Sequence, residues 1–268
     1  MRKENIRENK KNNKVDSSMD ITEIITRSAL VRSKIPDVEY VINPYLGCGH
    51  GCLYCYAAFM RRYSHHHAQF RWGTFVEVKV NIVEILRAEL SRKRKAGTVL
   101  LSSVCDPYQP VEMRYRLTRQ CIELLGEFGW GIDILTRSPL VTRDIDLFSS
   151  MSRISVGISI PTDSDRIRKI LEPTSPPIKS RLAALKQLHE AGVDTWAFIG
   201  PLLPMNPRNL YKALNPYVNH VYIDSLNYRD KVRNVFIRNR WDYEFTDDYA
   251  LKTGDELIRM FNDRAQRV

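Results

Sequence analysis

Short runs of apolar residues alternate with helical patterns from about residue 38 onward. The runs that we predict as strands are apolar at nearly every position, which is typical of strands buried on both faces of a parallel sheet. They cover residues 38–43, 98–104, 131–136, 154–160, 194–200 and 220–226. Between them, apolar residues recur every three or four positions, as on one face of an amphipathic helix. These helical segments cover residues 81–95, 117–128, 140–150, 163–171, 178–191, 206–216 and 247–264.

The regular alternation of strands and helices predicts an α/β fold with a partial (β/α)6 barrel. Barrels of parallel strands carry their chemistry at the C-terminal ends of the strands, so we expect the functional residues there. We divide the chain into three parts. Residues 1–18 are charged and Asn-rich, and we predict a disordered basic tail. Residues 19–245 form the core domain, and residues 246–268 contribute a C-terminal helix packed on that core.

Composition narrows the class of protein. Hydrophobic residues make up 43% of the 268 positions, which excludes wholesale disorder. Lys and Arg number 41 against 31 for Asp and Glu, and the net charge of +10 favours polyanionic partners. No apolar run approaches the roughly 20 residues that cross a bilayer, so we expect no membrane contact. The N-terminus has no apolar stretch after its charges, as a secretory signal would, and we expect a cytoplasmic protein.

Basic residues gather with aromatic ones in two segments, residues 113–119 and 228–241. Interleaved cations and rings suit contact with phosphates combined with base stacking, so DNA or RNA is the partner that these segments favour. Both follow predicted strands, and we expect them to flank the mouth of the barrel. The alternative is that they are ordinary solvated charged faces.

Three cysteines lie within eight residues, in the segment NPYLGCGHGCLYCYA, with the spacing C-x3-C-x2-C. Cys48, Cys52 and Cys55 are candidate ligands of zinc or of an iron–sulfur cluster, since thiolates bind soft metals. A structural zinc site needs a fourth ligand, which His50 or one of His65–His67 would supply. These last three histidines otherwise predict a solvated helix end. A four-iron cluster normally takes four cysteines, so three would leave one iron open.

The cysteine loop resembles the cluster motif of the radical S-adenosylmethionine (SAM) superfamily. This resemblance implies that Cys48, Cys52 and Cys55 ligate a [4Fe–4S] cluster whose open iron is chelated by SAM. It implies reductive cleavage of SAM to a 5′-deoxyadenosyl radical, which abstracts hydrogen from the substrate. It also implies a partial (β/α)6 barrel with the cysteine loop after the first strand, and an electron donor such as flavodoxin or ferredoxin.

Four further segments resemble the spore photoproduct lyase-like family, often described as DNA repair photolyases. They are DPYQPVE (106–112), LTRSPLVTRDIDL (135–147), ISVGISI (154–160) and LEPTSPP (171–177). The resemblance covers roughly residues 30–230 and implies a lyase-like reaction on a nucleic-acid lesion or base. One alternative is a radical SAM enzyme that acts on a peptide or small molecule. The other is a zinc-stabilised nucleic-acid-binding protein without enzymatic activity.

The resemblance also assigns residues to SAM. It implies that Tyr54 packs on the adenine and that Cys105 and Asp106 lie where the family holds the methionine part. Arg137 would face the SAM carboxylate, which a guanidinium can grip through two parallel hydrogen bonds. Ser159 would lie near the ribose and methionine. The Gly-Gly-Glu element that many superfamily members use for methionine is absent from this sequence.

The catalytic residues implied by the resemblance are Tyr56 and Cys105. In spore photoproduct lyase, tyrosine and cysteine are thought to return a hydrogen atom to the product radical. The cysteine of that enzyme corresponds to Ser103 here, and the nearest thiol is Cys105. If residues 103 and 105 continue the strand, they point to the same face, so Cys105 is predicted to replace the missing donor. Cys121, in a predicted helix, is interpreted as a small buried hydrophobe.

Overall fold

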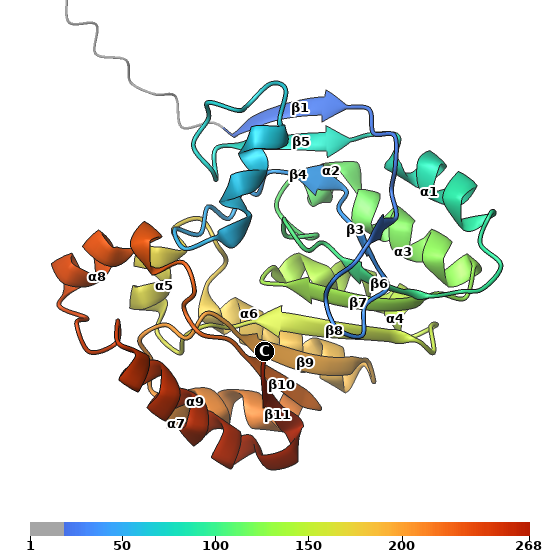
Figure 1. Ribbon diagram of the computed structural model, residues 1–268. Helices are drawn as coiled ribbons and strands as arrows, with labels where there is room; N and C mark the ends of the chain where they lie inside the picture. Colours follow the sequence, from blue (N-terminus) through green and yellow to red (C-terminus); the bar gives the residue numbers. More distant parts are fainter. Residues whose placement is uncertain (1–18) are drawn as a thin grey trace, which may run out of the picture.

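The computed structural model describes residues 19–268, so the tail predicted at residues 1–18 lies outside the described residues. Six parallel strands form the centre of an eight-stranded sheet and follow one another in chain order (Figure 1). A sequential order is that of a barrel wall, whereas a doubly wound sheet reverses its order near the middle. The six are β3 (Tyr40–Ile42), β6 (Thr98–Leu101), β7 (Gly131–Thr136), β8 (Ile154–Ser159), β9 (Asp194–Ile199) and β10 (His220–Ile223).

Two further strands extend the sheet at its edges. β2 (Val31–Arg32) runs antiparallel to β3, and β11 (Ala265–Arg267) runs parallel to β10. Over the described part of the chain these edge strands do not pair with each other, and the sheet stays open. The α/β class and the predicted partial barrel are therefore confirmed, with a short β2 and β11 that the sequence pattern did not reveal.

The helical segments predicted from periodicity are present. α3 shows why these segments form helices, since its apolar face buries Cys121, Ile122 and Leu125. The interpretation of Cys121 as a buried hydrophobe is confirmed. The first helix ends at Leu90, earlier than predicted, because the basic residues that follow are exposed and nothing packs a further turn. These helices are α1 (Ile82–Leu90), α3 (Leu117–Glu127), α4 (Ile145–Phe148), α5 (Asp165–Leu171), α6 (Ile178–Glu190), α7 (Pro207–Leu214) and α9 (Asp247–Phe261).

Several short elements were not predicted. Two are the α-helices α2 (Glu112–Tyr115) and α8 (Arg233–Asn239). The 3-10 helices η1 (Tyr56–Tyr63) and η4 (Arg229–Lys231) were not predicted either. The other 3-10 helices overlap predicted helical segments: η2 (Pro139–Asp144), η3 (Asn215–Tyr217) and η5 (Asn262–Arg264). The C-terminal helix α9 packs against α7, and β11 after it joins the main sheet beside β10 (Figure 1).

A second, three-stranded sheet stands beside the cysteine loop. It has the order β1 (Asp20–Ile24), β5 (Phe75–Lys79) and β4 (Tyr45–Leu46), and it lies at the top of the molecule in Figure 1. β4 runs directly into the cysteine loop, so this sheet anchors the start of the loop.

His67 is buried under the second sheet, which corrects the prediction of a solvated histidine at this position. Its ring stacks on Phe75 with the ring centroids 4.8 Å apart, and its Nδ1 lies 3.0 Å from a carboxylate oxygen of Glu77. His65 and His66 are exposed, as predicted. The error arose because the partners of His67 on β5 are not recognisable from the histidine run itself.

None of the helices in residues 19–268 is long and apolar enough to cross a membrane.

Candidate functional site

The predicted site residues meet where the central parallel strands end. The arrow of β8 points to the side of the molecule where the cysteine loop and α5 lie (Figure 1). Close contact between two glycines fixes the cysteine loop at this place. Gly51 has a φ of +57°, and a Cβ built on Gly73 would lie 2.6 Å from the Gly51 Cα, so only glycines allow this approach. The loop is therefore fixed against the segment that precedes β5.

The three thiols of the loop are gathered in a largely buried place. Cys48 and Cys52 are buried and Cys55 is half-buried. Burial raises the pKa of Cys48 well above its usual value, and the negative charges of Asp106, Cys52 and Cys55 raise it further. Burial also raises the pKa of Cys52 to about 12, although the nearby Arg137 opposes this. Without metal these thiols hold their protons at neutral pH, and metal binding would displace them.

The number of thiols suits a four-iron cluster with one open iron, whereas a structural zinc ion needs a fourth ligand. Within residues 19–268 no group of three His, Cys, Asp or Glu side chains is arranged to hold a single metal ion. Of the candidates for a fourth zinc ligand, His50 faces Asp106 and His67 faces Glu77.

Arg137 lies at the centre of a buried network beside the cysteine loop. Its Nη1 donates to the Cys52 sulfur at 2.9 Å, to the Tyr54 hydroxyl at 3.1 Å and to the carboxylate of Glu172. Glu172 also accepts from the Tyr54 hydroxyl and from Arg181. Burial alone would raise the pKa of Glu172, but the two guanidinium groups lower it. Two cations thus surround the Glu172 carboxylate, and Asp106 also lies close to Arg137, whose backbone N–H donates to it.

The remaining edge of Arg137 is available to a ligand. Its Nε and Nη2 make no hydrogen bond or ion pair with any residue in 19–268, whereas Nη1 is held in place. A guanidinium anchored on one nitrogen and free on the other two suits a carboxylate, which it can bind through two hydrogen bonds. The geometry is compatible with the predicted role of Arg137 toward the SAM carboxylate.

Asp106 joins the loop after β6 to the end of β7. Its carboxylate accepts hydrogen bonds from the Thr136 hydroxyl at 2.6 Å and from the backbone N–H groups of Tyr108 and Arg137, both at 2.9 Å. The Nε2 atom of His50 lies 3.3 Å away. Burial would raise the pKa of Asp106, but His50 and these hydrogen bonds lower it to about 2. The oxygens of Asp106 are thus occupied by hydrogen bonds within the protein. Contact of Asp106 with the methionine part of SAM stays a prediction.

Ser159 and Tyr54 differ in whether their hydroxyl groups have hydrogen-bond partners. The Ser159 hydroxyl at the end of β8 is buried and has no hydrogen-bond partner within the described chain. Such a group usually marks a missing polar partner, and a bound nucleoside would supply one. Tyr54 is buried among the apolar side chains of Leu171, Leu203 and Leu226, with its hydroxyl in the Arg137 network. Its predicted contact with adenine stays a prediction.

The loop after β6 corrects the geometry assumed for Cys105. The strand ends at Leu101, and Ser102 has a φ of +65°, in the left-handed region. The prediction that residues 103 and 105 share one face of a strand is therefore wrong. The Cys105 thiol donates to the backbone carbonyl of Tyr45 at 3.4 Å, whereas the Ser103 carbonyl accepts a hydrogen bond from the Tyr56 hydroxyl.

Tyr56 nevertheless contacts the loop that carries Cys105, because its hydroxyl donates to the Ser103 carbonyl. Burial raises the pKa of Cys105 to about 11. Burial also raises the pKa of Tyr56 to about 12, with smaller contributions from Cys55 and Cys105. Both side chains therefore keep their hydrogens at neutral pH. This is the state that a hydrogen-atom donor requires.

The two basic and aromatic segments differ in what they offer to a partner. In the second, Lys231 donates to the backbone carbonyl of Cys55, and the exposed ring of Tyr228 stacks with Tyr56 at 6.4 Å between centroids. This segment thus reaches the cysteine loop. Trp241 is buried, with its ring centroid 5.5 Å from that of Phe236, so it is not free to stack on a base.

In the first segment, Arg119 is already engaged by carboxylates. It contacts Asp144 at 2.9 Å, Asp146 at 2.7 Å and Glu123 at 3.0 Å. Its charge is neutralised within the protein and is not free for a phosphate.

Two residues of the site were not predicted to act there. Glu172 lies in the LEPTSPP segment, and this was the one signal in the sequence that pointed toward it. Arg181 carried no signal, because its role depends on contact with the buried Glu172 carboxylate, which no sequence pattern reveals.

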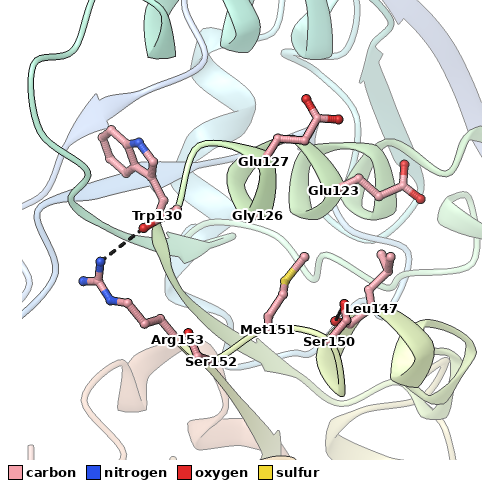
Figure 2. Close-up of a pocket in the computed structure, with 10 residues that line it drawn as sticks. Glu123, Gly126, Glu127, Trp130, Leu147, Ser150, Met151, Ser152 and Arg153 are labelled. Atoms are coloured by element: carbon pink, nitrogen blue, oxygen red, sulfur yellow. Dashed lines mark hydrogen bonds between the residues drawn. The ribbon is translucent and has the colours of Figure 1, made fainter.

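A cavity of about 400 Å³ lies elsewhere on the molecule (Figure 2). It opens where β7 and β8 begin, at the end of the sheet opposite to the cysteine loop. Its charged groups are engaged, since Glu127 pairs with Arg87 and Arg153 donates to the carbonyl of Gly129. We assign it no part in the site. It is lined by Glu123, Gly126, Glu127, Gly129, Trp130, Leu147, Ser150, Met151, Ser152 and Arg153.

Comparison with protein families gives one match. Residues 42–215, well over half of the chain, match the radical SAM superfamily. The match includes the cysteine loop, Arg137, Ser159 and Glu172.

Several relatives are similar in sequence. A protein of Methanocaldococcus jannaschii, described as uncharacterized, is 35% identical over 80% of this chain and 80% of its own length. An uncharacterized protein of Mycobacterium bovis is 33% identical over 68% of this chain, which spans 56% of that longer protein. A protein of Pseudomonas phage M6 named radical SAM Nalpha-GlyT isomerase is 28% identical over 60% of this chain and 33% of its own.

Solved structures share the fold. A spore photoproduct lyase mutant with bound SAM and dinucleoside spore photoproduct has a TM-score of 0.64 and 15% identity, covering 92% of this chain and 81% of that one. SuiB of Streptococcus suis, bound to the precursor peptide SuiA, has a TM-score of 0.56 and 13% identity, covering 85% and 48%.

Proposed function

Because this chain belongs to the radical SAM superfamily and is one of its enzymes, we propose that Cys48, Cys52 and Cys55 hold a [4Fe–4S] cluster. We further propose that SAM binds beside it on Arg137 and Ser159. The single observation that carries this proposal is the guanidinium of Arg137. One of its nitrogens is fixed on the Cys52 sulfur at 2.9 Å, and its other edge has no partner within the described chain.

Each residue then has a defined task. The cluster, when bound, supplies the electron that cleaves SAM to a 5′-deoxyadenosyl radical. Arg137 binds the SAM carboxylate with its free edge, and the buried Ser159 hydroxyl bonds a polar atom of SAM. Glu172, itself fixed by Arg181, holds the guanidinium in place. The cysteine loop, closed by Gly51 and Gly73, limits the access of water to the thiols.

We propose nucleic acid as the substrate class. The net charge of +10 favours a polyanion, and Lys231 places a cation at the third cysteine. The exposed, stacked rings of Tyr56 and Tyr228 beside it are suited to contact a base. A spore photoproduct lyase of the same fold is known with a bound dinucleoside.

Deuterium transfer tests this substrate class directly. The anaerobically reconstituted protein, reduced with dithionite, is given SAM and deuterated oligonucleotides, and 5′-deoxyadenosine is examined by mass spectrometry. We expect 5′-deoxyadenosine that carries deuterium, because the radical takes hydrogen from the substrate. A Cys52→Ala variant is the background control. Deuterium that arrives only from labelled peptides or small molecules would contradict the nucleic-acid assignment.

Cys105 is proposed to give a hydrogen atom to the product radical, which leaves a thiyl radical on Cys105. Tyr56 is proposed to give its hydrogen atom to that thiyl, and the resulting tyrosyl radical takes one electron from the reductant and one proton from solvent. Cys105→Ala is therefore expected to leave 5′-deoxyadenosine formation largely intact. It should lower the yield of the final product, in which the product radical has received a hydrogen atom. Cys105→Ser should show the same loss, because a serine O–H bond gives up hydrogen far less readily than a thiol. Product yield per 5′-deoxyadenosine is the measurement. An unchanged ratio in both variants would reduce Cys105 to a packing residue.

A further inference from the structure

We propose that η1 carries a docking surface for single-stranded nucleic acid, which guides the strand to the cysteine loop. We call it the η1 surface and define it by the exposed side chains of Tyr56, Phe59, Arg61, Arg62 and Tyr63. The inference rests on the proposed function, because it assigns a binding surface to the proposed substrate class. It names the residues that would hold the nucleotides next to the reacting one.

η1 begins at the cysteine loop and presents one row of side chains that is exposed throughout. Cys55 is the N-cap of this helix, so its first residue follows the third cysteine directly. In a 3-10 helix, residues three positions apart lie one above the other. Tyr56, Phe59 and Arg62 form such a row and are all exposed, whereas Ala57 on the next row is buried. Two rings and a cation therefore face solvent along a line that starts at the cysteine loop.

The rings of the η1 surface are free to stack on bases. Phe59 and Tyr63 stand edge-on with their centroids 6.4 Å apart, and both rings are exposed. Tyr56 stacks with the exposed Tyr228, and the Lys231 ammonium lies 4.9 Å from the centroid of the Tyr228 ring. Exposed apolar groups gathered in this way mark a contact site, and every base has a face on which a ring can stack.

The charge of this part of the chain favours a polyanion as the occupant. Residues 40–76 contain no Asp or Glu, and the next acidic residue, Glu77, is buried. Arg61 and Arg62 are exposed, and within residues 19–268 their side chains make no hydrogen bond or ion pair. Arg229 in η4, by contrast, pairs with Asp247. Free guanidinium groups interleaved with rings are suited to phosphates and bases together.

A single strand suits the η1 surface better than a duplex. In a duplex the faces of each base are already stacked on neighbouring bases, so exposed rings gain stacking only with unpaired bases. A reacting base must also leave the stack to reach a buried site. We therefore expect tighter binding of a single strand than of a duplex of the same sequence.

Fluorescence anisotropy with labelled DNA and RNA single strands tests the η1 surface on the reconstituted protein with SAM. The double variant Arg61→Gln, Arg62→Gln should bind more weakly. The slope of log K against log salt concentration should fall in magnitude by about 1.4, since each phosphate contact on a single strand contributes about 0.7. The matched control is Arg92→Gln, Arg94→Gln, which removes two exposed arginines from the segment before β6 and should keep the wild-type slope.

Phe59→Leu tests the stacking, because it removes the ring and keeps an apolar side chain. We expect about fivefold weaker binding of a single strand, which corresponds to about 1 kcal/mol of stacking on one base. Phe59→Tyr keeps the ring and should bind as the wild type does. All variants are compared at full cluster content, measured as iron and sulfide per chain.

The outcomes separate the η1 surface from the proposed function. Wild-type affinity and slope in the arginine variant and in Phe59→Leu would overturn the η1 surface and leave the substrate class standing. If the arginine variant binds strands normally but its cluster is reduced more slowly by a reduced flavodoxin, the surface belongs to the electron donor and the inference is wrong. A wild-type chain that cleaves SAM but binds no strand would overturn the surface and the substrate class together. A wild-type chain without a cluster would instead overturn the assignment of the three cysteines.

Discussion

Replacement of Cys48, Cys52 or Cys55 by alanine, one at a time, is expected to abolish cluster binding and the formation of 5′-deoxyadenosine. In the proposed site each thiol would cap a different iron. No other thiol is placed to replace it, because Cys121 is buried in α3 and the Cys105 thiol donates to Tyr45. The loss should exceed the 10–100-fold reductions that follow removal of outer-shell partners of metal sites. The measurement is the rate of 5′-deoxyadenosine formation under dithionite.

Cys121→Ala is the matched control for these variants. It removes a buried thiol that lies outside the loop, so it should bind a full cluster and cleave SAM at the wild-type rate. Wild-type activity in any one of the three loop variants would reject the assignment of that cysteine as a ligand.

Replacement of Arg137 by glutamine should weaken SAM binding strongly without removing the cluster. The variant loses the free guanidinium edge and leaves the buried Glu172 with Arg181 as its remaining cation. Truncation of one partner in a buried, hydrogen-bonded charge pair costs about 2–5 kcal/mol. For the pair of Arg137 and the SAM carboxylate, this raises the Kd of SAM at least about thirtyfold. Equilibrium dialysis of SAM against the reconstituted protein measures the effect.

Arg143→Gln is the control for Arg137. Arg143 is also half-buried and also binds buried carboxylates, those of Glu112 and Asp144, but it makes no contact with the cysteine loop. We expect a similar loss of stability in this variant and an unchanged Kd for SAM. If Arg137→Gln keeps both a full cluster and the wild-type Kd, Arg137 does not bind the SAM carboxylate.

Most of the main sheet could be predicted from the sequence, because its strands are buried on both faces. Segments such as Ile154–Ser159 consist of Ile, Val, Gly and Ser without a charged residue, and this pattern does not depend on knowing the partner strand. The second sheet was missed for the opposite reason. β1 is largely exposed, and β5 buries Glu77 only because His67 and Ser64 contact it.

The site was predictable where its signals are local. The spacing of the three cysteines lies within one loop, and Arg137 and Ser159 each end a recognisable strand. The role of Glu172 was not predictable, because it depends on Arg137 and Tyr54, which lie 35 and 118 positions away in the chain. The strand face assumed for Cys105 was wrong because Ser102 adopts a left-handed conformation, which a serine rarely does.

The central claim is that three thiolates of this chain hold a four-iron cluster and leave one iron for SAM. The most direct test is the iron, zinc and acid-labile sulfide content of the protein after anaerobic reconstitution. The account predicts about four irons and four sulfides per chain, lost when Cys48, Cys52 or Cys55 is replaced. One tightly held zinc per chain, with no sulfide, would contradict it.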